Sequence, residues 1–237
     1  MSRHNAIRLP RQNSGSAPAL LFYATRSGGT TLDIAEEQGN PFASALIEAA
    51  AEPRLQLRDL AKRLRKLTVA KSDGHQHVEC HGNVALPAWS FVENLGAKRE
   101  NRAALLLVVS DYSGLDAAAS LTGAARDERR IAAMLAQYGF SVTQGIAPRR
   151  KDLLKALKWF HRQAQCSEIA VIYSTGHGVE QDGIVYLLPA DYPVRAGVRR
   201  TALMRHAVSV PQLVEAASAP RQNLVFFAGC RTCLSND

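Results

Sequence analysis

The sequence predicts one α/β domain built on a doubly wound, mostly parallel sheet of about six strands with helices on both faces. Three observations support this fold class. Short apolar runs alternate with amphipathic segments of helical period, which is typical of parallel strands joined by helical crossovers. Hydrophobic residues make up 46% of the chain and charged residues 21%, a globular composition. The length of 237 residues is within reach of a single α/β domain with a sizeable core.

The front of the chain contains one predicted strand and two predicted helices. Residues 1–17 form a polar arm without periodicity, whereas ALLFYAT (19–25) is a short apolar run ended by RSGG, as expected of a strand. NPFASALIEAA (40–50) opens with an Asn cap and a Pro at the first helical position, which predicts a helix. Leu recurs at helical spacing across 55–70, which predicts a second helix. Residues 75–91 are expected to be irregular chain with one short extended piece.

Strands and helices alternate more regularly after a charged linker, 93–102. The first run there, AALLLVVS (103–110), is apolar throughout, as expected of a parallel strand covered on both faces. Further strands are predicted over 139–146, 168–174 and 223–230, and helices over 124–138, 150–164 and 210–218. In sheets of this kind the functional residues lie beyond the carboxyl ends of the strands.

Two reactive side chains come directly after predicted strands. His177 lies between two glycines in YSTGHG, and Cys230 closes NLVFFAGC. Because the carboxyl ends of parallel strands share one edge of a sheet, the imidazole and the thiol are expected to meet there as a base and its nucleophile. The backbone N–H groups of Gly178 and Cys230 could then form an oxyanion hole. From the residues alone, a surface turn with an incidental His is an equal alternative.

Several blocks of the sequence resemble the caspase and metacaspase superfamily of cysteine peptidases. VIYSTGHG, DGIVYLLPADYP and LVFFAGCR resemble its His block, the hairpin that follows and its Cys block. LLLVVSDYSGLDAAASLTGAARDERRIAAMLAQYGFSV resembles its first strand, its L-x-G-x-x-x-D loop and helix, and its second strand. The blocks follow the family's order from 103 to 231. The resemblance implies a caspase-like fold and an endopeptidase in which Cys230 is the nucleophile, His177 the general base, and Gly178 contributes its N–H to the oxyanion hole.

The front of the chain resembles a segment that bacterial caspase-like proteins carry after the catalytic Cys. It has a strand ending in YAT, a small-residue loop and a helix opening N-P-F, and GHQHVECHGNVALPAW takes the place of the family's last loop and strand. The resemblance therefore implies a circular permutation, in which a small-subunit-like portion (18–92) precedes a large-subunit-like portion (103–237). Strand 19–25 must then belong to the main sheet, and both chain ends should be mobile and close to the active crevice.

The resemblance also implies a substrate pocket. In metacaspases the pocket for a basic P1 side chain uses the Asp of the L-x-G-x-x-x-D loop, the residue two before the His and an Asp two before the Cys. These positions hold Asp127, Thr175 and Ala228. Because Ala228 lacks a carboxylate, capture of Arg or Lys should be weaker. A basic P1 side chain is nevertheless favoured, and the alternative, an acidic P1 side chain, would need an Arg in the pocket, which Arg126 or Arg231 could supply.

Three other functions compete with peptidase activity. Cys230 and Cys233, in CRTC, could form a redox couple, although such pairs usually precede a long helix. HQHVECH (75–81) contains residue types that bind Zn²⁺, although ligands from one short segment would be crowded. A catalytically inactive caspase-like scaffold that binds a regulatory protein partner is the alternative that Ala228 favours.

Composition limits the remaining functions. The net charge of +8 comes from scattered Lys and Arg with few aromatic residues between them, so a nucleic-acid partner is not predicted. The sequence has neither an apolar run of about 18 residues, as a membrane span needs, nor the apolar part of a secretory signal. These features and the four cysteines predict a protein of the reducing cytoplasm. We expect a peptide or protein substrate, assign no cofactor and no metal, and leave the oligomeric state open.

Overall fold

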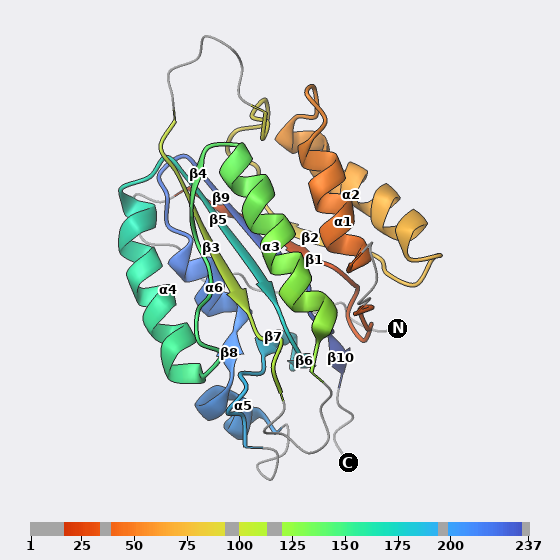
Figure 1. Cartoon of the computed structure of the whole chain (residues 1–237), viewed down its shortest axis with the longest axis vertical. Coiled ribbons are helices and arrows are strands. Elements are labelled where there is room, and N and C mark those ends of the chain that lie inside the picture. The colour runs from red at the N-terminus through yellow and green to blue at the C-terminus, as the bar shows by residue number, and fades with distance from the viewer. Residues whose placement is uncertain (1–16, 34–38, 93–99, 113–119, 194–198, 234–237) are drawn as a thin grey trace.

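The computed structural model describes residues 17–33, 39–92, 100–112, 120–193 and 199–233 (Figure 1). The described chain forms a six-stranded sheet, a smaller four-stranded sheet and helices packed on both faces of the larger one. The predicted α/β class is confirmed. None of the described helices is long and apolar enough to cross a membrane.

The larger sheet has the strand order β2-β1-β9-β5-β3-β4. All neighbours pair in parallel except β2, which runs antiparallel to β1 at the edge. The strands are β1 (Ala19–Tyr23), β2 (Glu79–Gly82), β3 (Arg102–Val108), β4 (Phe140–Thr143), β5 (Ile169–Thr175) and β9 (Gln222–Phe227). Each lies where the sequence predicted a strand or an extended piece. The front segment therefore contributes β1 to the interior of the main sheet, as the permuted arrangement requires.

Each face of this sheet has its own layer of helices. The helices α1 (Pro41–Ala50), α2 (Leu57–Lys71) and α3 (Thr122–Gln137) pack on one face, and α4 (Arg150–Gln165) and α6 (Val210–Ala216) on the other. Successive side chains of a strand alternate between the two cores, so all seven residues of β5 are buried. The predicted cap of α1 is confirmed, because Oδ1 of Asn40 accepts the N–H of Phe42 at 2.8 Å.

The smaller sheet has the order β10-β6-β7-β8 and extends beyond the carboxyl edge of the larger one. Its strands are β6 (Gly178–Gln181), β7 (Ile184–Leu187), β8 (Val208–Ser209) and β10 (Thr232–Cys233), and the helix α5 (Arg200–His206) precedes β8. The sequence predicted the hairpin of β6 and β7 but none of β8, β10 and α5.

The predicted flexible arm, most of the linker and the two chain ends lie outside the described residues. The first described residue, Ala17, lies at the amino edge of the sheet. Its N–H donates to the carbonyl of Ala219 at 3.0 Å, and its own carbonyl accepts from the Asn223 side chain at 2.8 Å. Ala17 thus precedes β1 at the edge opposite to the one that carries the predicted site.

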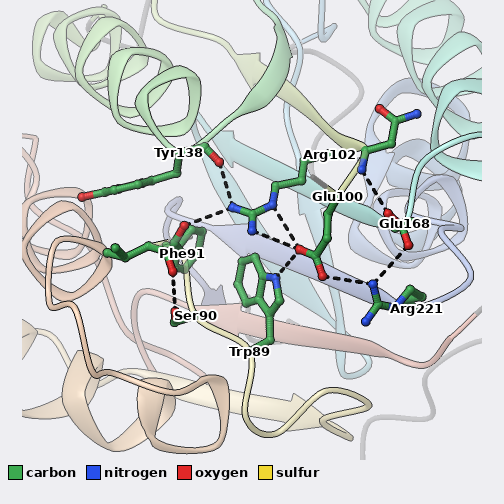
Figure 2. A network of polar contacts seen from close by, with 10 residues as sticks. Trp89, Ser90, Phe91, Glu100, Arg102, Tyr138, Glu168 and Arg221 are labelled. Atoms are coloured by element: carbon green, nitrogen blue, oxygen red, sulfur yellow. Dashed lines mark hydrogen bonds and ion pairs between the residues drawn. The ribbon is translucent and has the colours of Figure 1, made fainter. Parts of the chain in front are cut away.

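A network of polar contacts at the amino edge is centred on the buried guanidinium of Arg102 (Figure 2). This guanidinium donates to the carbonyls of Phe91, at 3.1 Å, and Tyr138, at 2.8 Å. It also donates to the Glu100 carboxylate, which accepts a further hydrogen bond from Trp89 Nε1 at 2.9 Å. These contacts hold the end of the front segment against the start of β3.

The same network reaches the starts of β5 and β9. Arg221 donates to Glu100 at 3.0 Å and to Glu168 at 3.1 Å. We call this set the amino-edge network, and it comprises Trp89, Phe91, Glu100, Arg102, Tyr138, Glu168 and Arg221. It joins the residues on the two sides of segment 93–99 to each other and to the sheet (Figure 2).

Candidate active site

The ends of β5 and β9 continue into two turns that run side by side. Residues that pair between β5 and β9 are separated by a constant number of positions in the sequence. Further along, residues that pair between β6 and β10 are separated by the same number. His177 and Cys230 are separated by this same number of positions. They lie after the pair β5 and β9 and before the pair β6 and β10. The structure therefore brings the predicted base and nucleophile level with each other on neighbouring backbones at the carboxyl edge.

Glycine is required where the two turns touch. A Cβ on Gly178 would lie 2.3 Å from the carbonyl oxygen of Cys230, and one on Gly229 would lie 2.6 Å from that of Gly176. Both distances are far below van der Waals contact, and the atoms met are backbone atoms that cannot rotate away. The glycines therefore allow the close approach that places His177 beside Cys230.

The thiol of Cys230 lies against the loop that follows β1. The N–H of Thr31 donates to its Sγ at 3.3 Å, and the Thr31 hydroxyl lies 3.5 Å from the same sulfur. The thiol is half-buried. The front portion of the chain thus supplies a residue that contacts the predicted nucleophile, a contact that the sequence did not indicate.

Side chains from far along the front portion hold this loop in place. Oε1 of the buried Gln76 accepts the N–H of Leu32 at 3.1 Å, and Nδ2 of Asn40 donates to the Leu32 carbonyl at 2.8 Å. Nε2 of His75 lies 3.0 Å from the hydroxyl of Thr30. Sequence reasoning missed these roles. A Gln between two His residues was the one available signal, and it does not reveal that its amide is buried.

Arg231, the residue after the predicted nucleophile, is buried and fully engaged. Its guanidinium pairs with Glu180 at 3.0 Å and with Glu79, and it donates to the Thr25 carbonyl at 3.2 Å. It also lies 4.1 Å from the ring centroid of Tyr23. The suggestion that Arg231 receives an acidic P1 side chain is therefore wrong, because two glutamates already occupy its donors. Its role is to tie β10 to β1, β2 and β6.

The three predicted substrate-binding residues lie on the face of the sheet that α1 to α3 cover. Thr175 ends β5, whereas Ala228 directly follows the neighbouring strand β9 and packs in the core of that face. Asp127 comes from α3. All three side chains are buried. Thr175 and Ala228 lie on neighbouring backbones and Asp127 lies on the same face of the sheet, inside the protein rather than on an open surface.

The carboxylate of Asp127 has two partners within the chain. Its Oδ2 accepts the backbone N–H of Asn40 at 2.8 Å, and its Oδ1 accepts from Arg130 at 2.9 Å. Burial raises the pKa of Asp127, and the Asn40 N–H and Arg130 offset only part of that rise. Gly39 has a φ of +62°, and a Cβ there would lie 2.2 Å from Oδ1. Asp127 therefore also supports the start of α1.

A family model of the caspase domain matches residues 101–236. The match covers more than half of the chain and includes both turns of the site. The chain belongs to the caspase-domain family. The caspase domain is that of the C14 cysteine peptidases, which are hydrolases of peptides and proteins, although the domain is inactive in some members. No curated protein matches the chain. The front portion of the chain, which provides β1 and Thr31, lies outside the matched residues.

The zinc site considered for residues 75–81 is not formed. Cys80 and His81 are consecutive in β2, so their side chains lie on opposite faces, and the ring of His81 packs 5.7 Å from that of Tyr23. Burial raises the pKa of the Cys80 thiol to about 11, which disfavours a thiolate ligand. Among the described residues, which include His75 and His77, no group of three His, Cys, Asp or Glu side chains could hold a metal ion.

The two cysteines of CRTC have separate environments in this caspase domain. Sγ of Cys233 lies 3.5 Å from the hydroxyl of Ser27, whereas Cys230 contacts Thr31. Both are free thiols. Cys233 lies in the short strand β10 rather than at the start of a helix, where a redox pair gains its reactivity. The geometry gives the redox alternative no support.

Proposed function

We propose that this caspase domain is a cysteine endopeptidase that cleaves peptide bonds with a dyad of Cys230 and His177. The observation that carries the proposal is that these two residues lie opposite each other on two turns whose backbones are in contact. His177 takes the thiol proton, and the sulfur attacks the substrate carbonyl carbon while the N–H groups of Gly178 and Cys230 stabilise the oxyanion. The imidazolium then protonates the leaving amine, and water hydrolyses the acyl-enzyme.

A substitution at each cysteine of CRTC tests this proposal. The protein is treated with iodoacetamide and assayed with a positional-scanning peptide library. We expect wild type to be alkylated at Cys230 and to cleave peptides, Cys230→Ala to do neither, and the matched control Cys233→Ala to do both. Preferential alkylation of Cys233, or cleavage that survives Cys230→Ala, would overturn the dyad.

We infer that the preferred P1 side chain is Arg or Lys. The support is the buried carboxylate of Asp127 on the same face of the sheet as Thr175 and Ala228, together with the pairing of Arg231 with two glutamates. An incoming guanidinium must compete with Arg130 for Oδ1 of Asp127, so the preference should be modest. The same library, read on wild type and Asp127→Asn, tests it: the variant should lose the preference for basic P1 residues, and a wild type that prefers acidic residues would refute it.

We also propose that the chain is a circular permutant of a bacterial-type, metacaspase-like enzyme and acts in the cytoplasm. The support for permutation is the place of β1 between β9 and β2 in the main sheet. Four unpaired thiols agree with a reducing compartment. Cell fractionation tests the localisation, and recovery of the protein in an oxidising compartment would contradict it.

A catalytically inactive scaffold is the second candidate. Two observations favour it, namely the pairing of Asp127 with Arg130 and the absence of a carboxylate at Ala228. A scaffold would cleave no peptide of the library, and its binding of a regulatory partner would survive Cys230→Ala. The peptide-library assay on wild type therefore distinguishes an enzyme from a scaffold.

A further inference from the structure

Tyr112 is buried directly beside His177. Its hydroxyl accepts the backbone N–H of His177 at 2.9 Å and donates to the carbonyl of Leu188 at 2.7 Å. The two rings are tilted by 57°, with centroids 4.4 Å apart. The phenol therefore contacts both the backbone and the imidazole of the predicted base.

The Tyr112 hydroxyl links two residues that continue the antiparallel pairing of β6 with β7. The antiparallel register of β6 and β7, continued by one residue, sets His177 opposite Leu188. The N–H of Leu188 donates directly to the His177 carbonyl at 2.9 Å. A hydrogen-bonded antiparallel pair would exchange a second direct bond, from the His177 N–H to the Leu188 carbonyl. Tyr112 is inserted in place of that second bond and links the same two groups through its oxygen.

The glycine before the histidine makes room for this insertion. A Cβ on Gly176 would lie 2.8 Å from the Tyr112 hydroxyl oxygen and 2.7 Å from Cδ1 of Leu187, and its φ is +153°. Burial raises the pKa of Tyr112, although its hydrogen bond with His177 opposes the shift. The hydroxyl therefore keeps the proton that it donates to Leu188 across the neutral range.

We propose that Tyr112 is a positioning residue, which fixes the orientation of the His177 imidazole by bridging its backbone to Leu188 and packing against its ring. The inference rests on the proposed peptidase function, in which a general base needs a third group to orient it. Here the phenol acts through the backbone and the imidazole ring.

Tyr112→Phe removes the bridging oxygen and keeps the ring. We expect kcat to fall about tenfold, the effect of one hydrogen bond that matters in the transition state, with KM changed by less than about twofold. Tyr112→Leu also removes the ring and should cost about 100-fold in kcat. Tyr173→Phe is the matched control, since the buried Tyr173 hydroxyl has no hydrogen-bond partner among the described residues. Its kcat should stay at the wild-type value, and its melting temperature should not fall, since no hydrogen bond among the described residues is lost.

A spectroscopic readout separates positioning from a merely structural role. The ¹H–¹³C signal of the His177 ring, assigned by its loss in His177→Ala, should shift or broaden in Tyr112→Phe and stay unchanged in Tyr173→Phe. An unchanged ring signal together with an unchanged kcat in Tyr112→Phe would overturn the proposal. If wild type cleaves no peptide, the proposed function fails, while the ring signal still decides whether Tyr112 orients His177.

Discussion

At the scale of single residues, Asp127 links a predicted substrate contact to the stability of the fold. Burial raises its pKa above the ordinary 3.8, with partial offset by the Asn40 N–H and Arg130. The folded state therefore binds the proton more tightly than the unfolded state. This carboxyl contributes most to stability when protonated, and that contribution falls as the pH rises from about 4 through the folded pKa.

Asp127→Asn should remove this pH dependence, since the amide does not titrate and its oxygen can still accept the N–H of Asn40. The free energy of unfolding, measured in urea at several pH values between about 4 and 7, should fall for wild type relative to the variant as the pH rises, because the other titrating groups contribute equally to both proteins. Equal slopes for the two proteins would show that Asp127 does not titrate differently on folding.

Arg231 is the residue whose loss should be most destabilising near the site. Arg231→Met would leave the buried Glu180 with the Ser27 hydroxyl but without its cation. Removal of one partner of a buried ion pair costs about 3–5 kcal/mol. Urea unfolding at neutral pH measures this loss, and Arg231→Lys, which keeps the charge, should lose less. A loss below about 1 kcal/mol for the Met variant would mean that the pair is effectively solvated.

The sequence was informative about residues that end strands and uninformative about those that meet across the chain. His177 and Cys230 each follow an apolar run, so their common edge could be deduced from the topology of parallel sheets. Tyr112 and Thr31 reach the same site from loops distant in sequence. A single Tyr or Thr in a polar loop has many equivalent explanations, and only the folded chain shows which side chain it meets.

At the scale of secondary-structure elements, the contact between the two site turns limits which residues they can contain. Gly178→Ala would place a Cβ against the Cys230 carbonyl and push β6 away from β10. We expect the rate of Cys230 alkylation to fall at least tenfold, because His177 moves with the turn. Iodoacetamide labelling with mass-spectrometric readout measures the rate.

Gly183 supplies the control for that experiment. It lies in the turn between β6 and β7 with a φ of +74°, and a Cβ there would meet nothing within 4 Å. Gly183→Asn, which tolerates this conformation, should therefore leave the alkylation rate unchanged. Equal rates in Gly178→Ala and Gly183→Asn would argue against a dependence of the site on close backbone approach.

The elements that were predicted and those that were not differ in length and patterning. Five strands of the larger sheet carry an apolar run, and its five helices carry a helical period or a start signal, whereas β2, with the sequence ECHG, was expected only as a short extended piece. The strands β8 and β10 have two residues each and α5 has seven. Two-residue strands show no measurable period, and α5, unlike the equally short α6 with its Pro in the first turn, begins without a start signal in the sequence.

At the scale of the whole molecule, permutation predicts that the order of the two portions can be reversed. A chain consisting of residues 100–237 followed directly by 1–92 would begin and end at the amino-edge network. We expect it to fold to the same sheet, with a melting temperature within a few degrees of wild type and the same alkylation rate at Cys230. A rearranged chain that is soluble but lacks a cooperative thermal transition would contradict this expectation.

The amino-edge network bears on whether the two portions of the chain need a continuous backbone between them. Glu100 and Arg102 hold Trp89 and Phe91 by charge and hydrogen bonds, and β1 is paired with β9 along its full length. The polypeptide between residues 92 and 100 is therefore not what keeps the two portions together. If a protease severed the backbone there, the two fragments should stay associated as a stable pair, with the edge that carries Cys230 untouched at the far end of the sheet.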